Sequence, residues 1–98
     1  MKRDEIIKRL ETLKAIYHQE RCYNFDGGID SIINKLQASS TQAGKAWEEA
    51  AATYRALAGT KCGFSDVYVD AGSAAERVAA NIELDEIRQL LWDTFKRI

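Results

Sequence analysis

Ala58-Gly59-Thr60-Lys61-Cys62-Gly63-Phe64-Ser65-Asp66-Val67-Tyr68-Val69-Asp70 is the stretch of this 98-residue chain that lacks the pattern of an amphipathic helix. Two glycines frame a turn at its start. Gly59 follows a helical pattern, where a residue free to adopt positive φ ends a helix, and Gly63 lets the backbone turn again. After Gly63 the side chains alternate with a period of two, which is typical of extended backbone. We therefore expect helices on both sides of an extended or irregular segment at about residues 59–72.

A lone extended segment leaves its backbone N–H and C=O groups without a neighbouring strand. Two arrangements satisfy these groups. The segment can lie across the helices, with side chains such as Ser65 and Asp66 bonding to the backbone, or it can pair with another molecule. The first arrangement is favoured, and it predicts that the Asp66 carboxylate accepts backbone N–H groups within the loop. Gly59, Gly63 and Asp66 are thus the expected structural residues of the segment.

The composition favours helices and one compact unit. The chain contains no proline, the strongest helix breaker, and its 46% hydrophobic and 30% charged residues are usual for a globular protein. A chain of this length forms a single domain, which we place at residues 1–98. No apolar run approaches the roughly 18 residues of a membrane span, and acidic Asp4 and Glu5 stand where a signal peptide is apolar. We expect a cytoplasmic protein that does not bind membranes.

Four amphipathic segments surround the opening stretch. Apolar residues at helical spacing predict helices from Asp4 to about Gln19, from about Ile29 to Ala38, from Ser39 to Ala58 and from Ala74 onward. A serine followed three residues later by glutamine or glutamate forms a capping box, and Ser39 and Ser73 both begin one. The sequence therefore predicts an all-α fold, with four main helices in an antiparallel bundle.

The last helical segment has two apolar faces on nearly opposite sides of a continuous helix. The first face contains Ala74, Ala75, Val78 and Ile82, and the second contains Ile87, Leu90, Leu91 and Phe95. We interpret this phase shift as a break or bend near residues 81–84, with Asn81 as a second N-cap. A short helix followed by a longer one is the result that we expect.

Two features of the middle of the chain concern packing. Trp47 and Tyr54 lie on an alanine-rich stripe, which predicts a central helix whose neighbours approach closely while the two rings fill the core. Before the second helix, the pair Gly27-Gly28 predicts a flexible connection that packs Tyr23 or Phe25 against the bundle.

Chemically active side chains are few. His18 and Cys22 are four residues apart, and only together with Cys62 and a carboxylate would they form a zinc site or a small catalytic site. Their spacing matches no zinc motif and no nucleophile signature. We therefore expect no metal, no cofactor and no catalysis, with both cysteines reduced. A small enzyme that uses His18, Cys22 and Cys62 is the less favoured alternative.

The charge is distributed unevenly along the chain. Residues 64–86 contain six acidic residues and one arginine, a balance of −5, and the remainder carries +4. An acidic surface with aromatic side chains suits a basic protein partner. The partner-binding residues that we predict are Phe64, Tyr68, Asp70 and Glu76. The alternative, in which Glu83, Asp85 and Glu86 merely complement a helix N-terminus, stays open.

The basic residues of the first helix do not indicate a nucleic-acid site. Lys8 and Arg9 each follow an acidic residue, Asp4 and Glu5 respectively, by four positions, so the charges pair along one helix face. We expect no nucleic-acid partner.

The run Gly63-Phe64-Ser65-Asp66-Val67 resembles a signature of small uncharacterised bacterial helical proteins: a glycine-rich turn, serine, phenylalanine, asparagine, aspartate and an aliphatic residue. Phe64, Asp66 and Val67 match it, whereas Ser65 stands in place of the asparagine. Some such proteins resemble immunity proteins of bacterial toxin systems, which implies binding without catalysis. We predict an immunity-type protein that neutralises a basic toxin domain. A homo-oligomeric structural or regulatory protein, a homodimer included, is the alternative.

Overall fold

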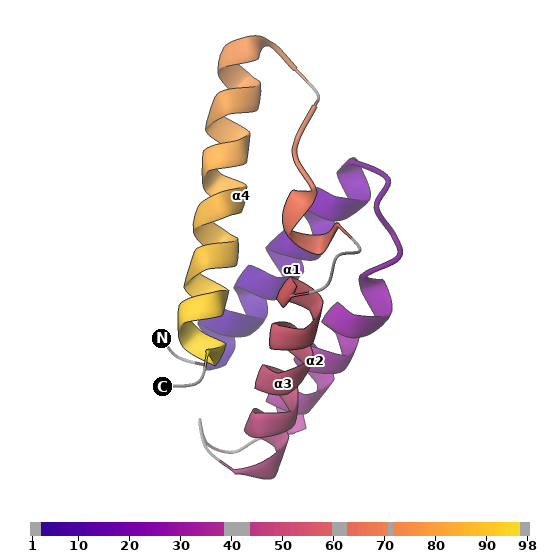
Figure 1. Cartoon of the computed structure of the whole chain (residues 1–98), viewed down its shortest axis with the longest axis vertical. Coiled ribbons are helices and arrows are strands. Elements are labelled where there is room, and N and C mark those ends of the chain that lie inside the picture. Colours follow the sequence, from indigo (N-terminus) through magenta and orange to yellow (C-terminus); the bar gives the residue numbers. More distant parts are fainter. Residues whose placement is uncertain (1–2, 39–43, 60–62, 71, 97–98) are drawn as a thin grey trace.

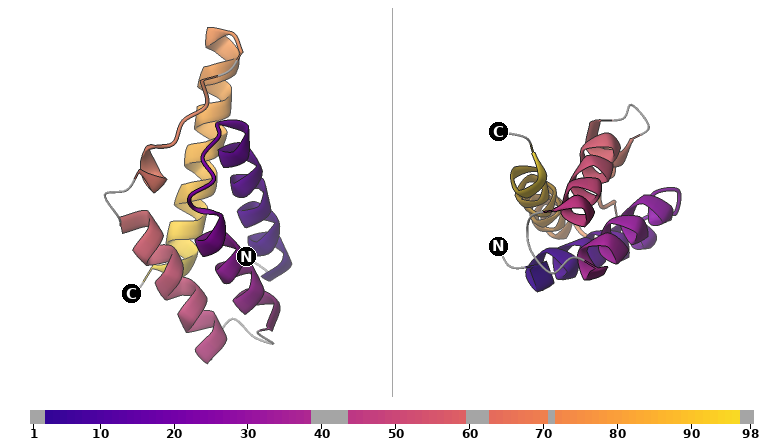
Figure 2. Two further views of the ribbon diagram at one scale, coloured as in Figure 1. Left: turned by 90° about the vertical axis from the view of Figure 1, so that its right-hand side faces the viewer. Right: turned by 90° about the horizontal axis from the view of Figure 1, so that it is seen from below.

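The structure, a computed structural model, describes residues 3–38, 44–59, 63–70 and 72–96. The helical elements are α1 (Arg3–Gln19), α2 (Asp26–Ala38), α3 (Lys45–Gly59), the 3-10 turn η1 (Phe64–Asp66) and α4 (Ala74–Phe95). Successive helices alternate in direction, and the start of α1 lies near the end of α4 (Figure 1). Seen from below, α3 and α4 form one layer and α1 and α2 another (Figure 2). The predicted all-α bundle, with an irregular segment before its last helix, is confirmed.

The core lies between the helices and is built from side chains spaced three or four residues apart. Its fully buried members include Ile6, Leu10, Leu13 and Tyr17 of α1, Ile29, Ile32 and Leu36 of α2, Ala50 and Tyr54 of α3, and Leu84, Ile87, Leu91 and Phe95 of α4. Phe64 of η1 lies among them, 1% exposed. Its ring meets those of Tyr17, Phe25 and Tyr54 edge-on, at centroid distances of 5.3, 5.3 and 5.8 Å. The turn η1 is therefore part of the core.

The segment between α3 and α4 is only partly extended. Gly63 has the positive φ (94°) that the sequence predicts for a turn residue, and the backbone then forms η1, with the Asp66 N–H donating to the Gly63 carbonyl at 3.0 Å. Extended backbone begins at Val67 (φ −62°, ψ 133°). The period-two pattern predicted for residues 64–69 thus agrees with the alternating burial of residues 67–69 and is wrong for residues 64–66, which form η1.

α4 is one continuous helix of 22 residues, so the predicted break near Asn81 is wrong. Its second half packs on the core. Its first half projects beyond the other helices, and the chain that follows η1 runs beside it (Figure 1). The phase shift in the sequence arises because Val78 and Ile82 face solvent, 60% and 54% exposed. The change of apolar face is real, but it marks a surface and not a bend.

Of the two predicted capping boxes, the one at the start of α4 can be compared with the structure. At Ser73 the capping box is confirmed, with Glu76 N–H donating to Ser73 Oγ at 3.2 Å and Ser73 N–H donating to Glu76 Oε1 at 3.3 Å. The predicted box at Ser39 lies outside the described residues. The third helix begins at Lys45, later than predicted, because Gly44 has a φ of 97° that a helix cannot accommodate.

At two places the conformation or position of glycines differs from the prediction. Gly59 ends α3, as expected, but without the predicted positive φ. Gly27 and Gly28 lie in the first turn of α2 and not in a flexible connection. A Cβ at Gly28 would come within 2.8 Å of Leu57 Cδ1, so this glycine allows α2 and α3 to pack closely.

Aromatic side chains near the ends of helices differ in burial. Tyr54 is buried as predicted, whereas Trp47 is only partly buried at the edge of the core, where it contacts Phe95 at 5.2 Å between ring centroids. The prediction that the Trp47 ring fills the core is wrong, because this residue lies near the start of α3, where its ring packs against Phe95 at the edge of the core. Phe25 packs on the bundle as expected, and the exposed Tyr23 ring contacts the His18 ring at 4.9 Å.

Candidate functional site

Residues 67–70, which we call the extended segment, lie along the first half of α4. Val67 and Val69 are buried, whereas Tyr68 between them is 63% exposed. Side chains of an extended backbone alternate between its two faces, so one face of the segment packs inward and the other presents Tyr68 to solvent. Two side chains of α4 hold the segment in place.

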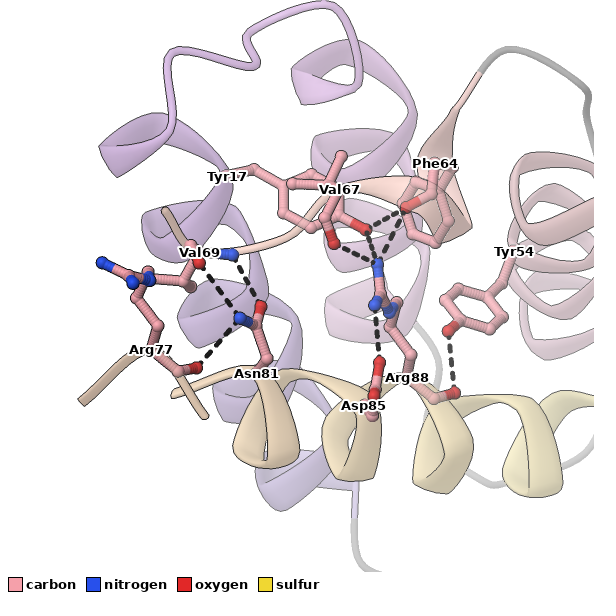
Figure 3. Close-up of polar contacts among 9 residues, drawn as sticks. All are labelled: Tyr17, Tyr54, Phe64, Val67, Val69, Arg77, Asn81, Asp85 and Arg88. Carbon is pink, nitrogen blue, oxygen red and sulfur yellow. Dashed lines mark hydrogen bonds and ion pairs between the residues drawn. The ribbon is translucent and has the colours of Figure 1, made fainter. Parts of the chain in front are cut away.

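Asn81 of α4 holds the middle of the extended segment. Its Oδ1 accepts the Val69 N–H at 2.6 Å, and its Nδ2 donates to the Val69 carbonyl at 3.0 Å (Figure 3). The same Nδ2 donates to the Arg77 carbonyl one turn earlier, at 2.9 Å. One amide side chain thus does for Val69 what a neighbouring strand does in a sheet.

Arg88 of α4 holds the start of the segment. Its Nη1 donates to the carbonyls of Val67 at 2.9 Å and Phe64 at 3.3 Å, and its Nη2 pairs with Asp85 at 2.7 Å (Figure 3). The side chain is only 14% exposed. Burial lowers the pKa of Arg88, but hydrogen bonds with Asp85 and Tyr17 outweigh it, so the pKa lies above its usual value. The guanidinium therefore stays charged where it joins the segment to the core.

Two buried tyrosines complete this network. The Tyr17 hydroxyl donates to the Phe64 carbonyl, and the Tyr54 hydroxyl donates to the Arg88 carbonyl at 3.0 Å. Burial raises the pKa of both hydroxyls above the usual tyrosine value. Both remain neutral donors, which is what carbonyl acceptors require.

A shallow groove of about 450 Å³ lies between the extended segment and the outer side of α4. Its lining includes Tyr68, Asp70, Val78, Ile82 and Asp85, which we call the α4 face. Arg77 also lines the groove, but its Nη1 donates to the Gly72 carbonyl at 2.7 Å. The α4 face thus combines three exposed apolar or aromatic side chains with two carboxylates.

The predicted partner-binding residues separate in the structure. Tyr68 and Asp70 lie together on the α4 face. Phe64 is buried in the core, so the prediction that its ring is an exposed anchor is wrong. Glu76 is engaged in the capping box and, two positions from Val78, points to the other side of the helix.

Asp66 differs from its predicted role. Its carboxylate is exposed, and no N–H of the described residues donates to it. The expectation that this carboxylate organises the loop is wrong: Asn81 accepts the Val69 N–H, and Arg88 and Tyr17 donate to backbone carbonyls of residues 64–67. The general prediction, that side chains satisfy a segment lying across helices, is confirmed.

Sequence reasoning missed Val78 and Ile82 as surface residues, although the phase shift in the last helix was the signal. It also missed Arg88, for which the sequence carries no signal. An arginine in an amphipathic helix reads as a solvent-exposed residue, and only the position of the extended segment shows that it is enclosed.

His18 and Cys22, the described residues of the alternative metal or catalytic site, each contact other groups. His18 Nε2 contacts the Asp26 carboxylate at 2.6 and 2.7 Å, and the Cys22 thiol donates to the Glu20 carbonyl at 3.6 Å. Cys62 lies outside the described residues. Within the parts that the structure describes, no three His, Cys, Asp or Glu side chains are placed to hold a metal.

The described helices include none that is both long enough and apolar enough to cross a membrane. Comparisons with protein-family models, with curated proteins and with solved structures give no match for this chain. The function must therefore be inferred from the site's own geometry.

Proposed function

We propose that this is a non-catalytic cytoplasmic protein that binds a basic protein partner on the α4 face. One observation carries the proposal: Val78 and Ile82 are exposed on the half of α4 that projects from the bundle, beside the exposed ring of Tyr68. Apolar side chains that cluster on a rigid helix, with a polar rim, are typical of protein interfaces. An aromatic ring at the centre of such a cluster is a common anchor.

The charge of the rim supports a basic partner. Asp70 and Asp85 line the groove, and Asp85 is 73% exposed on its side chain even though it pairs with Arg88. The cations here, Arg77 and Arg88, both donate to backbone carbonyls of this chain. Because these arginines are already bonded within the chain, the exposed carboxylates can attract lysine and arginine side chains of a partner, which raises the association rate.

The most concrete form of this function is an immunity-type protein that neutralises a bacterial toxin by covering its active surface. Its support is the resemblance of residues 63–67 to a signature of small bacterial helical proteins, some of which resemble immunity proteins, together with an acidic, apolar face on a helix. Such a protein needs binding alone, and the α4 face supplies apolar contact and charge for it.

The test begins with the source cell. The tagged chain is used to capture a partner, which is identified together with the products of neighbouring reading frames, and the purified pair is then measured by surface plasmon resonance. Ile82→Ser should weaken binding at least about tenfold, because it removes a buried contact of the complex. Leu90→Ser is the matched control, since Leu90 is a 41% exposed apolar residue of the same helix outside the α4 face.

The immunity form has its own readout. Co-expression of the chain should restore growth to cells that produce the toxin encoded beside it, and the Ile82→Ser variant should not. Equal binding by wild type and Ile82→Ser would contradict the use of the α4 face. If wild type sediments as a dimer that Ile82→Ser converts to a monomer, the face joins two copies and the homo-oligomeric alternative holds.

A further inference from the structure

The extended segment has two backbone edges, and they differ in how their polar groups are satisfied. Consecutive residues of an extended backbone direct their N–H and C=O groups to opposite sides. The carbonyl of Val67 and both groups of Val69 bond to side chains of α4. The groups of Tyr68 therefore face the other way, and neither has a hydrogen-bond partner among the described residues.

We call the side of the segment to which the Tyr68 groups point its outer edge. The next N–H on this edge, that of Asp70, is already bonded to a side chain. The Asp70 N–H donates to Glu20 Oε1 at 2.8 Å. Glu20 lies just beyond the end of α1, and its carboxylate takes the place that the carbonyl of a neighbouring strand would take. A side-chain acceptor of this kind can be displaced by a peptide carbonyl, after which the carboxylate is free to pair with a cation.

A groove of about 410 Å³ runs along the same edge. Its lining is Glu20, Cys22, Gly63, Asp66, Val67, Tyr68 and Asp70. Three of these residues are carboxylates, and the described part of the lining contains no lysine or arginine. The groove thus offers backbone groups on one wall and negative charge around them.

From these observations we propose that the outer edge of the extended segment binds an extended, lysine- or arginine-bearing segment of the partner by strand addition. The added strand bonds to the N–H and C=O of Tyr68 and to the N–H of Asp70, and its cations meet Glu20 and Asp66. Main-chain bonds supply the affinity in this mode and side-chain pockets supply the specificity. The proposal rests on the proposed function, since Tyr68 and Asp70 belong to both grooves and one partner covers both.

The probe for the test is a synthetic, end-blocked hexapeptide of alternating lysine and valine, added to the full ¹⁵N-labelled chain. Hydrogen exchange of the Tyr68 amide, followed by NMR, should slow on saturation with this peptide. The same peptide N-methylated at every backbone nitrogen keeps its lysine charges but has no backbone N–H donor, and it should bind at least about tenfold more weakly. A glutamate–valine peptide should not bind, because it carries the charge of the groove.

Protein variants separate charge from backbone pairing. Glu20→Gln keeps an acceptor for the Asp70 N–H but removes a charge, so binding of the lysine peptide should weaken several-fold and lose part of its salt dependence. Glu11→Gln, an exposed carboxylate elsewhere on α1, should have no effect.

Three results would overturn the proposal: no binding at millimolar peptide, equal binding of the N-methylated peptide, or unchanged Tyr68 exchange in the saturated complex. Exchange that slows with protein concentration in the absence of peptide would assign the edge to a second copy of the chain, and it would equally reject a peptide partner. The proposed function is tested apart from this by Ile82→Ser, which should leave peptide binding intact. If the peptide does not bind but Ile82→Ser still weakens binding of the partner, strand addition is rejected and the proposed function stands.

Discussion

The side-chain amide of Asn81 bonds to both backbone polar groups of Val69, so that a helix residue acts as the neighbouring strand of an extended segment. Asn81→Asp keeps the size of the side chain but replaces its donor with a charged acceptor. The carbonyls of Val69 and Arg77 then lose their donor, and the free energy of unfolding should fall by about 1 to 3 kcal/mol. Urea denaturation measures the change. Asn34→Asp, at an exposed site on α2, is the control and should have little effect.

Replacing Arg88 with lysine should lower the stability of the fold, although the charge is kept. The guanidinium reaches the carbonyls of Val67 and Phe64 with one nitrogen and Asp85 with another, and a single ammonium cannot make all of these bonds. Arg88→Lys should cost about 1.5 to 3 kcal/mol of stability in urea unfolding. Arg9→Lys, on the exposed side of α1, should be neutral. Equal stabilities of the two variants would show that the fork geometry of Arg88 contributes nothing.

Alkaline pH should destabilise the fold through the buried tyrosines. Burial raises the pKa of Tyr54 above the ordinary value of 10.0, so the folded state keeps its proton where the unfolded chain releases it. The stabilisation is complete below pH 10 and is lost as the pH rises above it. Tyr54→Phe cannot titrate, so its stability should fall less steeply over about pH 10 to 11. Tyr23→Phe, at an exposed site, should keep the slope of the wild type.

Two adjacent glycines of α2 should respond in opposite ways to alanine. A Cβ at Gly27 meets nothing within 4 Å, so Gly27→Ala should raise the free energy of unfolding by about 0.5 to 1 kcal/mol through helix propensity. At Gly28 the same Cβ lies 2.8 Å from Leu57 Cδ1, so that gain should be cancelled or reversed.

A double variant shows whether the contact with Leu57 is the cause. In the Leu57→Ala background the Gly28→Ala change should recover most of the propensity gain, because the clashing methyl group is absent. Thermal unfolding of the four proteins in this cycle measures the coupling. No coupling between the two positions would mean that Gly28 has another role.

The sequence alone predicts the helices, because each needs only local spacing of apolar residues and local caps. The positions of Ile6, Leu10, Leu13 and Tyr17 define the buried side of α1 without any knowledge of its neighbours. The capping box at Ser73 is equally local, since all its bonds lie within four residues. Gly63 is recognisable as a turn residue for the same reason.

The candidate site was only partly predictable. Tyr68 and Asp70 are predicted from the acidic and aromatic side chains of residues 64–86, and both lie on the α4 face. Phe64 has the same appearance in the sequence, but its side chain enters the core because η1 rotates it inward. Whether an aromatic residue of a loop is an anchor or a core residue depends on the backbone of the turn before it.

What the sequence by itself determined is the set of helices, the turn at Gly63 and the two opposed apolar faces of the last helix. Only the tertiary structure decided that this helix is straight, that Val78 and Ile82 therefore face solvent, and that Arg88 and Asn81 hold the extended segment. The physical reason is the range of the interactions. Helix periodicity and capping act over about one turn, whereas the bonds from Arg88 to Phe64 and from Asn81 to Val69 join residues 24 and 12 positions apart, which no local pattern records.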